Sequence, residues 1–253
     1  WVGKDYAARM NRVLVIPSLV LLLLGAVTFW WSRGPARAEQ AYGAAGPPIV
    51  FATADEIKTL DVGKMSWMND IRTAMGLWEG LVSYEPKTLA IEPGVAEKWE
   101  ISPDGKKYTF HLRHTARWSN GDPVRAGDFL FAWQRVLTPS TGADYINLFS
   151  PIAGAEAYSN ALAEKRPADF TTVGVHAPDD YTVIVTLAHP CTYFLDLCAF
   201  APFYPLHAAS MRPFLLDPVD PTKGYDGRWT RPPHLVTNGA FYLKEWEFKR
   251  HLL

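Results

Sequence analysis

The chain has 253 residues with 25 basic and 26 acidic side chains, a formal net charge of -1. This balance gives no excess of basic residues of the kind typical of nucleic-acid-binding proteins. With 48% hydrophobic and 20% charged residues, the composition is typical of a globular chain of one or two domains. Ten Trp, 11 Tyr and 13 Phe fit either large cores or a cleft that stacks on ligands.

The first predicted element is an export segment at residues 10–38, preceded by residues 1–9, which we interpret as a non-native or upstream extension. Residues 13–31 carry no charge, and the small-x-small triplet at 36–38 is typical of a signal-peptidase site. The apolar stretch is also just long enough to span a bilayer. A cleaved signal peptide, a membrane anchor and a buried core helix therefore remain alternatives, and the first two place the following residues outside the cytoplasm.

Residues 39–48 are rich in Gly and Pro and predict a linker, and residues 49–55 predict a short buried strand. A helix is expected over residues 67–79, where apolar residues recur with helical spacing. Ser66 precedes this stretch and is the expected N-cap.

Two β-hairpins are predicted in the next part of the chain. The pair Asp104-Gly105 is a strong turn signal between "KWEIS" and "KKYTFHLR", and residues 172–187 repeat the pattern around "PDD". On such a strand His111 and His114 point to opposite faces. We therefore expect solvent-facing histidines rather than a metal pair.

Helices are predicted after Pro123, at residues 155–165 and at residues 191–200. The first carries one apolar stripe that includes Phe129 and Trp133. Residues 239–253 predict a strand that continues to the last residue, which favours a truncated chain.

The sequence shows no motif of a serine hydrolase, zinc protease, phosphate-binding loop or dinucleotide-binding loop. Asp179 and Asp180 are neighbours in a tight turn, where carboxylates diverge. Asp217, Asp220 and Asp226 do not have the spacing of an EF-hand loop. We expect no enzyme, no cofactor and no metal.

The two cysteines, Cys191 and Cys198, would lie about 10 Å apart on the predicted helix. This separation is too long for a disulfide between them. They are either two small buried hydrophobic residues or partners of a cysteine outside this chain.

Several motifs occur in a characteristic order and spacing, and together they resemble the extracellular solute-binding family 5 of ABC importers, the oligopeptide- and dipeptide-binding proteins. They are "LD" at 60–61, "WEGL" at 78–81, "PGVAEKWEISPDGKKYTFHLR" at 93–113, "ARWSNGDPVRAGDF" at 116–129 and "VTNGAFYL" at 236–243. The resemblance covers residues 49–253, about the N-terminal half of a family member.

The resemblance implies an α/β protein with the two-lobed periplasmic-binding-protein type II fold, truncated here, with an N-terminal hydrophobic helix. Residues 49–80 and 188–253 would form an incomplete lobe I, and residues 81–187 the extra small β-rich domain. The composition changes near Gly80, in agreement with this boundary.

The resemblance also implies a function. The chain would be the substrate-binding component of a peptide importer, a monomer in the periplasm or another extracytoplasmic space. It would capture extended peptides in an interlobe cleft and deliver them to ABC permease subunits. The alternatives are a membrane-anchored sensor or accessory protein, held by residues 13–31, and a binder of a sugar, an opine or a nickel chelate.

The ligand-binding residues implied by the resemblance are Ser66, Trp67, Met68 and Tyr145. The family has an acidic residue at the position of Ser66, so the charge that it would offer is missing here. A structural role is the alternative for Trp67 and for Tyr145. At Arg125 relatives often place a Thr or Ser helix cap, whose loss should cost about 1 kcal/mol.

Overall fold

The computed structural model describes residues 55–253, which lie within one compact unit. The extension at 1–9, the predicted export segment at 10–38 and the linker at 39–48 lie outside the described residues, as does the predicted strand at 49–55 apart from Asp55. Among the described residues, no helix combines the length and the apolar character needed to cross a bilayer.

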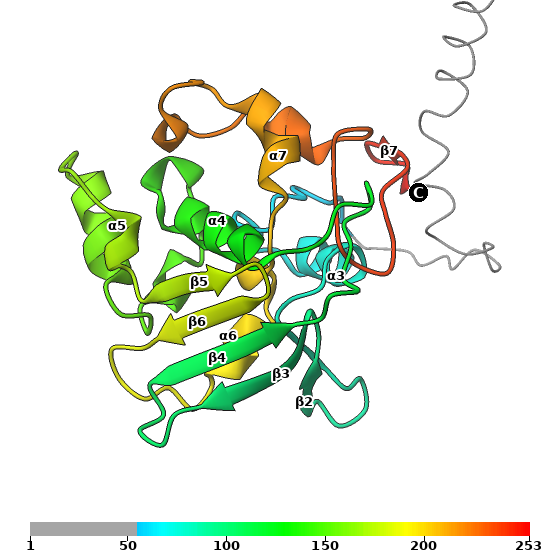
Figure 1. Cartoon of the computed structure of the whole chain (residues 1–253). Coiled ribbons are helices and arrows are strands. Elements are labelled where there is room, and N and C mark those ends of the chain that lie inside the picture. Colours follow the sequence, from blue (N-terminus) through cyan, green and yellow to red (C-terminus); the bar gives the residue numbers. More distant parts are fainter. Residues whose placement is uncertain (1–54) are drawn as a thin grey trace, which may run out of the picture. The chain divides into compact units, whose positions relative to one another are not determined.

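An antiparallel four-stranded sheet, in the order β3-β4-β6-β5, forms the largest sheet of this unit (Figure 1). Its strands are β3 (Ala96–Ile101), β4 (Lys107–Leu112), β5 (Val175–Asp179) and β6 (Thr182–Thr186). Alternate side chains face the core: Phe110 of β4 is fully buried between its cross-strand neighbours Trp99 and Val183. Both predicted hairpins are confirmed.

Two smaller sheets pair β1 (Val82–Tyr84) with β2 (Ile91–Pro93), and β7 (Trp246–Glu247) with β8 (His251–Leu252). The α-helices are α3 (Met68–Leu77), α4 (Ala126–Leu137), α5 (Ala155–Ala163), α6 (Phe194–Cys198) and α7 (Ala208–Met211). Short 3₁₀ helices are η1 (Pro139–Thr141), η2 (Ile146–Phe149), η3 (Phe170–Thr172), η4 (Ala201–Phe203), η5 (Arg212–Phe214), η6 (Pro221–Lys223) and η7 (Gly227–Thr230).

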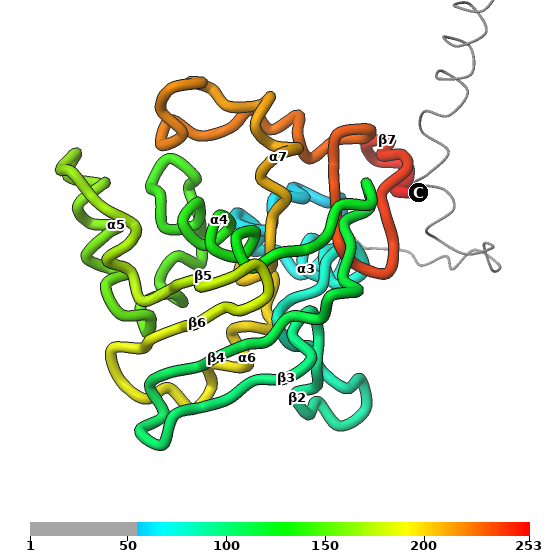
Figure 2. Tube along the Cα trace, viewed as in Figure 1, coloured from blue at the N-terminus to red at the C-terminus, as the bar shows by residue number. Residues whose placement is uncertain are grey.

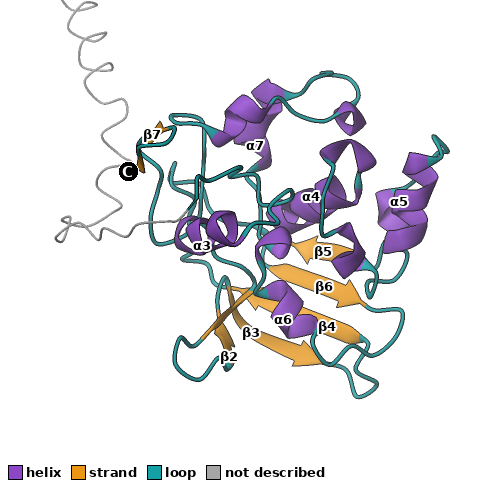
Figure 3. Ribbon diagram, turned by 180° about the vertical axis from the view of Figure 1, so that it is seen from behind, coloured by secondary structure: helices purple, strands orange, loops and turns teal. Residues whose placement is uncertain are grey.

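Helix α4 packs on strands β5 and β6 through its predicted apolar stripe. Trp133 is fully buried, and its ring meets those of Phe149 and Phe203 edge-on at 6.1 and 5.5 Å. Helix α6 lies against the sheet (Figure 3), where the ring of Phe194 is 4.8 Å from that of Tyr108. The structure is therefore a mixed α/β arrangement with a core between helices and sheet.

The start of α4 replaces the missing Thr or Ser cap in another way. The carboxylate of Asp128 accepts the backbone N–H of Arg125 at 2.8 Å and the indole N–H of Trp118 at 3.0 Å. Burial raises the pKa of Asp128. The guanidinium of Arg125 pairs with Asp180, which ties the helix to the β5–β6 turn.

Helix α3 is held from outside by the segment at 236–243, which runs beside it (Figure 2). The amide of Asn238 accepts the N–H of Glu79 at 3.2 Å and donates to the Glu79 carbonyl at 3.0 Å. A Cβ at Gly239 would lie 2.5 Å from the backbone of Leu77, so only glycine fits there. Two of the recognised motifs thus meet through the Asn238 side chain and the Glu79 backbone.

Two sequence predictions were wrong in extent. The helix expected over 191–200 is limited to α6, and Pro202 cannot donate the hydrogen bond that would continue it beyond its C-terminal end. The single strand expected over 239–253 is the short β7–β8 hairpin, whose turn contains Lys249 with a φ of 60°.

Cys191 and Cys198 are free thiols with 7% and 0% of their surface exposed. Burial raises the pKa of Cys198 well above its ordinary value. Their burial agrees with the interpretation of both as small buried hydrophobic residues.

Candidate functional site

Ser66 and Asp144 join two distant segments of the chain at the predicted ligand-binding surface. The Ser66 hydroxyl donates to the Asp144 carboxylate at 2.5 Å, across a separation of 78 residues. The structure therefore brings Ser66, Trp67 and Met68 close to the segment that carries Tyr145. The prediction of Ser66 as the N-cap of α3 was wrong. Trp67 holds that position, without a side-chain capping bond.

Trp67 and Met68 expose a large apolar surface at the start of α3, with 54% and 60% of their area accessible. The ammonium group of Lys58 lies 2.9 Å from the centroid of the Trp67 ring, in a cation–π contact. Trp67 is therefore not a core residue. Exposed aromatic surface beside charged groups is typical of interaction sites.

Tyr145 has a partly structural environment. It is half-buried at the start of η2, and its ring meets that of Phe200 edge-on at 5.4 Å. Its neighbour Asp144 is exposed and forms no ion pair within residues 55–253. Sequence reasoning missed Asp144, because only a contact between distant segments reveals it.

Asp70 lies fully buried beneath the first turn of α3. One carboxylate oxygen accepts the backbone N–H of Lys58 at 2.9 Å, and the other has no hydrogen-bond partner among the described residues. Burial raises the pKa of Asp70. Through this bond Asp70 holds the segment whose Lys58 side chain covers Trp67.

The two histidines of β4 and its exit do not converge. His111 is half-buried, with its Nε2 atom 3.4 Å from Glu100, and His114 is exposed and stacks on Tyr181 at 3.8 Å. The expectation that they face solvent is confirmed for His114 and only partly for His111.

Most of the acidic residues considered as a catalytic dyad or a calcium site accept backbone hydrogen bonds within turns. Asp179 accepts the N–H of Tyr181 at 2.8 Å. The three aspartates of the later loop each accept a backbone N–H two residues ahead, at distances of 2.9, 3.0 and 2.9 Å: Asp217, Asp220 and Asp226. Within residues 55–253, the group with ligand atoms close enough for a metal is Glu245, Glu247 and His251 on the β7–β8 hairpin. Glu247 is engaged by Arg250 at 2.5 Å.

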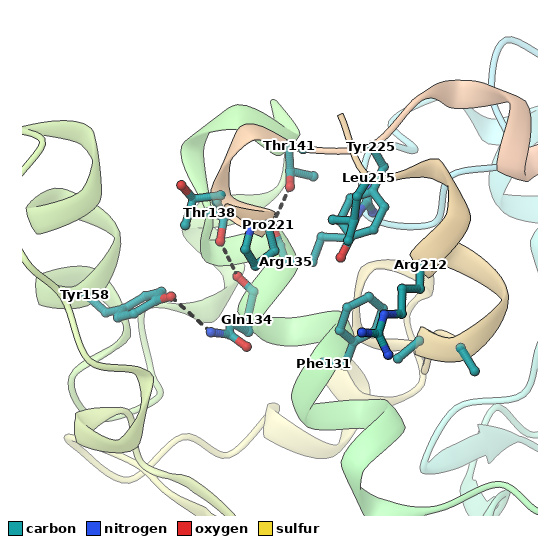
Figure 4. Close-up of a pocket in the computed structure, with 14 residues that line it drawn as sticks. Phe131, Gln134, Arg135, Thr138, Thr141, Tyr158, Arg212, Leu215, Pro221 and Tyr225 are labelled. Atoms are coloured by element: carbon teal, nitrogen blue, oxygen red, sulfur yellow. Dashed lines mark hydrogen bonds between the residues drawn. The ribbon is translucent and has the colours of Figure 1, made fainter. Parts of the chain in front are cut away.

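A pocket of about 400 Å³ lies between α4, α5 and the segment at 208–225 (Figure 4). The residues that line it do not include Ser66, Trp67, Met68 or Tyr145. No sequence motif pointed to it, since its walls come from segments far apart in the chain.

Comparison with known proteins matches residues 90–252 to the family model described as bacterial extracellular solute-binding proteins, family 5 Middle. The chain is 36% identical over 200 residues to the periplasmic oligopeptide-binding protein OppA of Salmonella typhimurium, covering 78% of this chain and 34% of that relative. It is 40% identical over 157 residues to the dipeptide-binding protein DppE of Bacillus subtilis, covering 62% and 26%. The chain thus spans about a third of these relatives or less.

Solved structures of oligopeptide-binding proteins also align with this chain. The substrate-binding domain of an oligopeptide ABC transporter from Bacillus anthracis aligns with a TM-score of 0.70 at 37% identity, covering 80% of this chain and 36% of that one. Haemophilus influenzae OppA in complex with the peptide RPPGFSPFR aligns with a TM-score of 0.67 at 32% identity, covering 78% and 36%.

Proposed function

This chain belongs to the bacterial extracellular solute-binding proteins of family 5, and on this premise we propose that it forms one side of the peptide cleft in the substrate-binding component of an ABC importer. The observation that carries the proposal is the contact between Ser66 and Asp144. Together with the exposure of Trp67 and Met68, this contact supports a shared surface with the segment of Tyr145. The OppA relatives are named for oligopeptide binding.

The whole protein would have the two-lobed type II fold, with a second lobe closing over this surface. Lobe I would comprise residues 49–80 and 188–253, and residues 81–187 would be the small domain. The six strands from β1 to β6 all fall within that last range, which supports the division. The protein would act outside the cytoplasm and pass its ligand to permease subunits, and residues 10–38 would serve as export signal or anchor.

The chemistry of this surface suits peptides of varied sequence. Trp67 and Met68 offer apolar area to ligand side chains, while the ammonium of Lys58 and the carboxylate of Asp144 lie near it as charges of opposite sign. An extended ligand would pair mainly through its backbone, which every peptide shares. Micromolar binding corresponds to about -8 kcal/mol, enough to shift a lobe-closing equilibrium of a few kcal/mol.

The test is a titration of the whole protein with a mixed library of short peptides, followed by tryptophan fluorescence and calorimetry. We expect saturable binding, and Trp67→Ala should raise the Kd about tenfold, as for an aromatic anchor in an interface. Leu89→Ala is the matched control, because Leu89 is 68% exposed in the β1–β2 turn, outside the segments proposed to contact the ligand. A flat response across the library would refute the proposal.

A further inference from the structure

The pocket between α4, α5 and the segment at 208–225 has features of a second ligand site. Its volume of about 400 Å³ lies in the range of small-molecule sites, roughly 300 to 1,000 Å³. Its walls are mostly apolar: Phe131 and Ala208 on one side, Leu215, Pro221 and Tyr225 on the other.

Specific contacts keep the pocket from collapsing. The Ser140 hydroxyl donates to the Thr222 carbonyl at 2.5 Å, and Leu215 forms a β-bridge with Tyr225. These bonds fix the segment at 215–225 above α4. Beneath it, the buried guanidinium of Arg135 donates to Asp61 at 2.7 Å. The loop is therefore anchored to η1, directly after α4, at the edge of the pocket.

Hydrogen-bond donors lie at two ends of this apolar space. Tyr158 is only 5% exposed, and its hydroxyl accepts from the Gln134 amide at 3.4 Å, which leaves its own proton available. Arg212 makes no side-chain hydrogen bond or ion pair within residues 55–253. In Figure 4 its guanidinium lies beside Phe131, and Tyr158 lies at the opposite side of the view.

The charge balance of the pocket is positive. None of the described residues that line it is acidic. Of its two arginines, Arg135 is neutralised by Asp61, whereas Arg212 has no counter-ion. Asp220 lies beside the pocket wall but is engaged by Thr222 and by Lys223 at 3.8 Å. A guanidinium without a counter-ion at the edge of an apolar pocket favours an anionic ligand.

We propose that this pocket binds a small organic carboxylate with an apolar body, separately from the peptide cleft. The carboxylate pairs with Arg212, the body packs against Phe131 and Tyr225, and a polar group at the far end can accept from Tyr158. The pocket lies wholly within residues 131–225, so it does not require the second lobe.

The experiment is calorimetric titration of the full 253-residue chain with 4-phenylbutyrate, and with 4-phenylbutan-1-ol as the uncharged counterpart. We expect one saturable site for the acid and binding at least tenfold weaker for the alcohol. Arg212→Gln should raise the Kd of the acid about tenfold, since a charge-assisted bond is lost. Tyr158→Phe should raise the Kd of 4-(4-hydroxyphenyl)butyrate more than it raises the Kd of 4-phenylbutyrate.

Arg72→Gln is the matched control, because Arg72 is also an exposed arginine without an ion pair within residues 55–253 and does not line the pocket. It should leave the Kd unchanged. Absence of saturable binding by the acid, equal binding of acid and alcohol, or equal effects of Arg212→Gln and Arg72→Gln would each overturn the proposal.

Discussion

Asp70 illustrates how one buried carboxylate at the start of α3 makes folding stability depend on pH. Its carboxylate is fully buried, accepts from the Lys58 backbone and has a raised pKa because of burial. Between the ordinary pKa of 3.8 and the raised one, the folded state holds more protons than the unfolded chain. The free energy of unfolding contributed by Asp70 therefore falls as pH rises through this window.

We expect Asp70→Asn to remove this contribution. The stability of the variant relative to the wild type should increase as pH is raised from about 4, measured by urea denaturation at several pH values. Asp104→Asn is the comparison, because hydrogen bonding to Ser102 lowers the pKa of Asp104. In that case the wild type should lose stability relative to the variant as pH falls below 3.8. Parallel pH profiles for the wild type and Asp70→Asn would contradict the argument.

Single residues were also where prediction from sequence was least complete. The exposed positions of Trp67 and Met68 agree with a ligand-facing role, which itself stays a prediction. The bond from Ser66 to Asp144 spans 78 residues, and no local pattern encodes such a contact. The same applies to Arg125, whose missing cap is offset by Asp128.

At the scale of elements, strand β4 is a central strand of the four-stranded sheet. It pairs with β3 on one side and β6 on the other, and Phe110 at its centre is fully buried. We expect Phe110→Ala to lower the free energy of unfolding by about 3 to 5 kcal/mol. Urea denaturation followed by circular dichroism measures it.

Thr109 on the opposite face of β4 provides the control, since it is only half-buried. Thr109→Ala should change stability by less than about 1 kcal/mol. Similar losses for both variants would show that backbone pairing, and not burial of one face, sets the stability of the strand.

Elements with local signals were predictable and those shaped by contacts were not. Turn residues such as Asp104 and Gly105 specify the β3–β4 hairpin, and the apolar stripe of α4 identifies that helix. The short α6 and the division of residues 239–253 into β7 and β8 depend on Pro202 and on the turn at Lys249, whose effects periodicity does not report.

At the scale of the whole molecule, the chain spans 34% of the OppA relative from Salmonella typhimurium. A peptide bound to one side of a cleft is only partly removed from water, whereas small-ligand sites bury about 70 to 90% of ligand surface. We therefore expect the 253-residue chain to bind peptides at least about a hundredfold more weakly than the whole protein. Side-by-side calorimetry measures the difference, and equal affinities would contradict it.

The two interior thiols have a practical consequence for such measurements. Cys191 and Cys198 are the chain's complete set of cysteines, and neither presents more than 7% of its surface. A thiolate must form and become accessible before an alkylating reagent can attack it. The rate of thiol alkylation would therefore report how often this part of the protein opens, with no label or engineered probe.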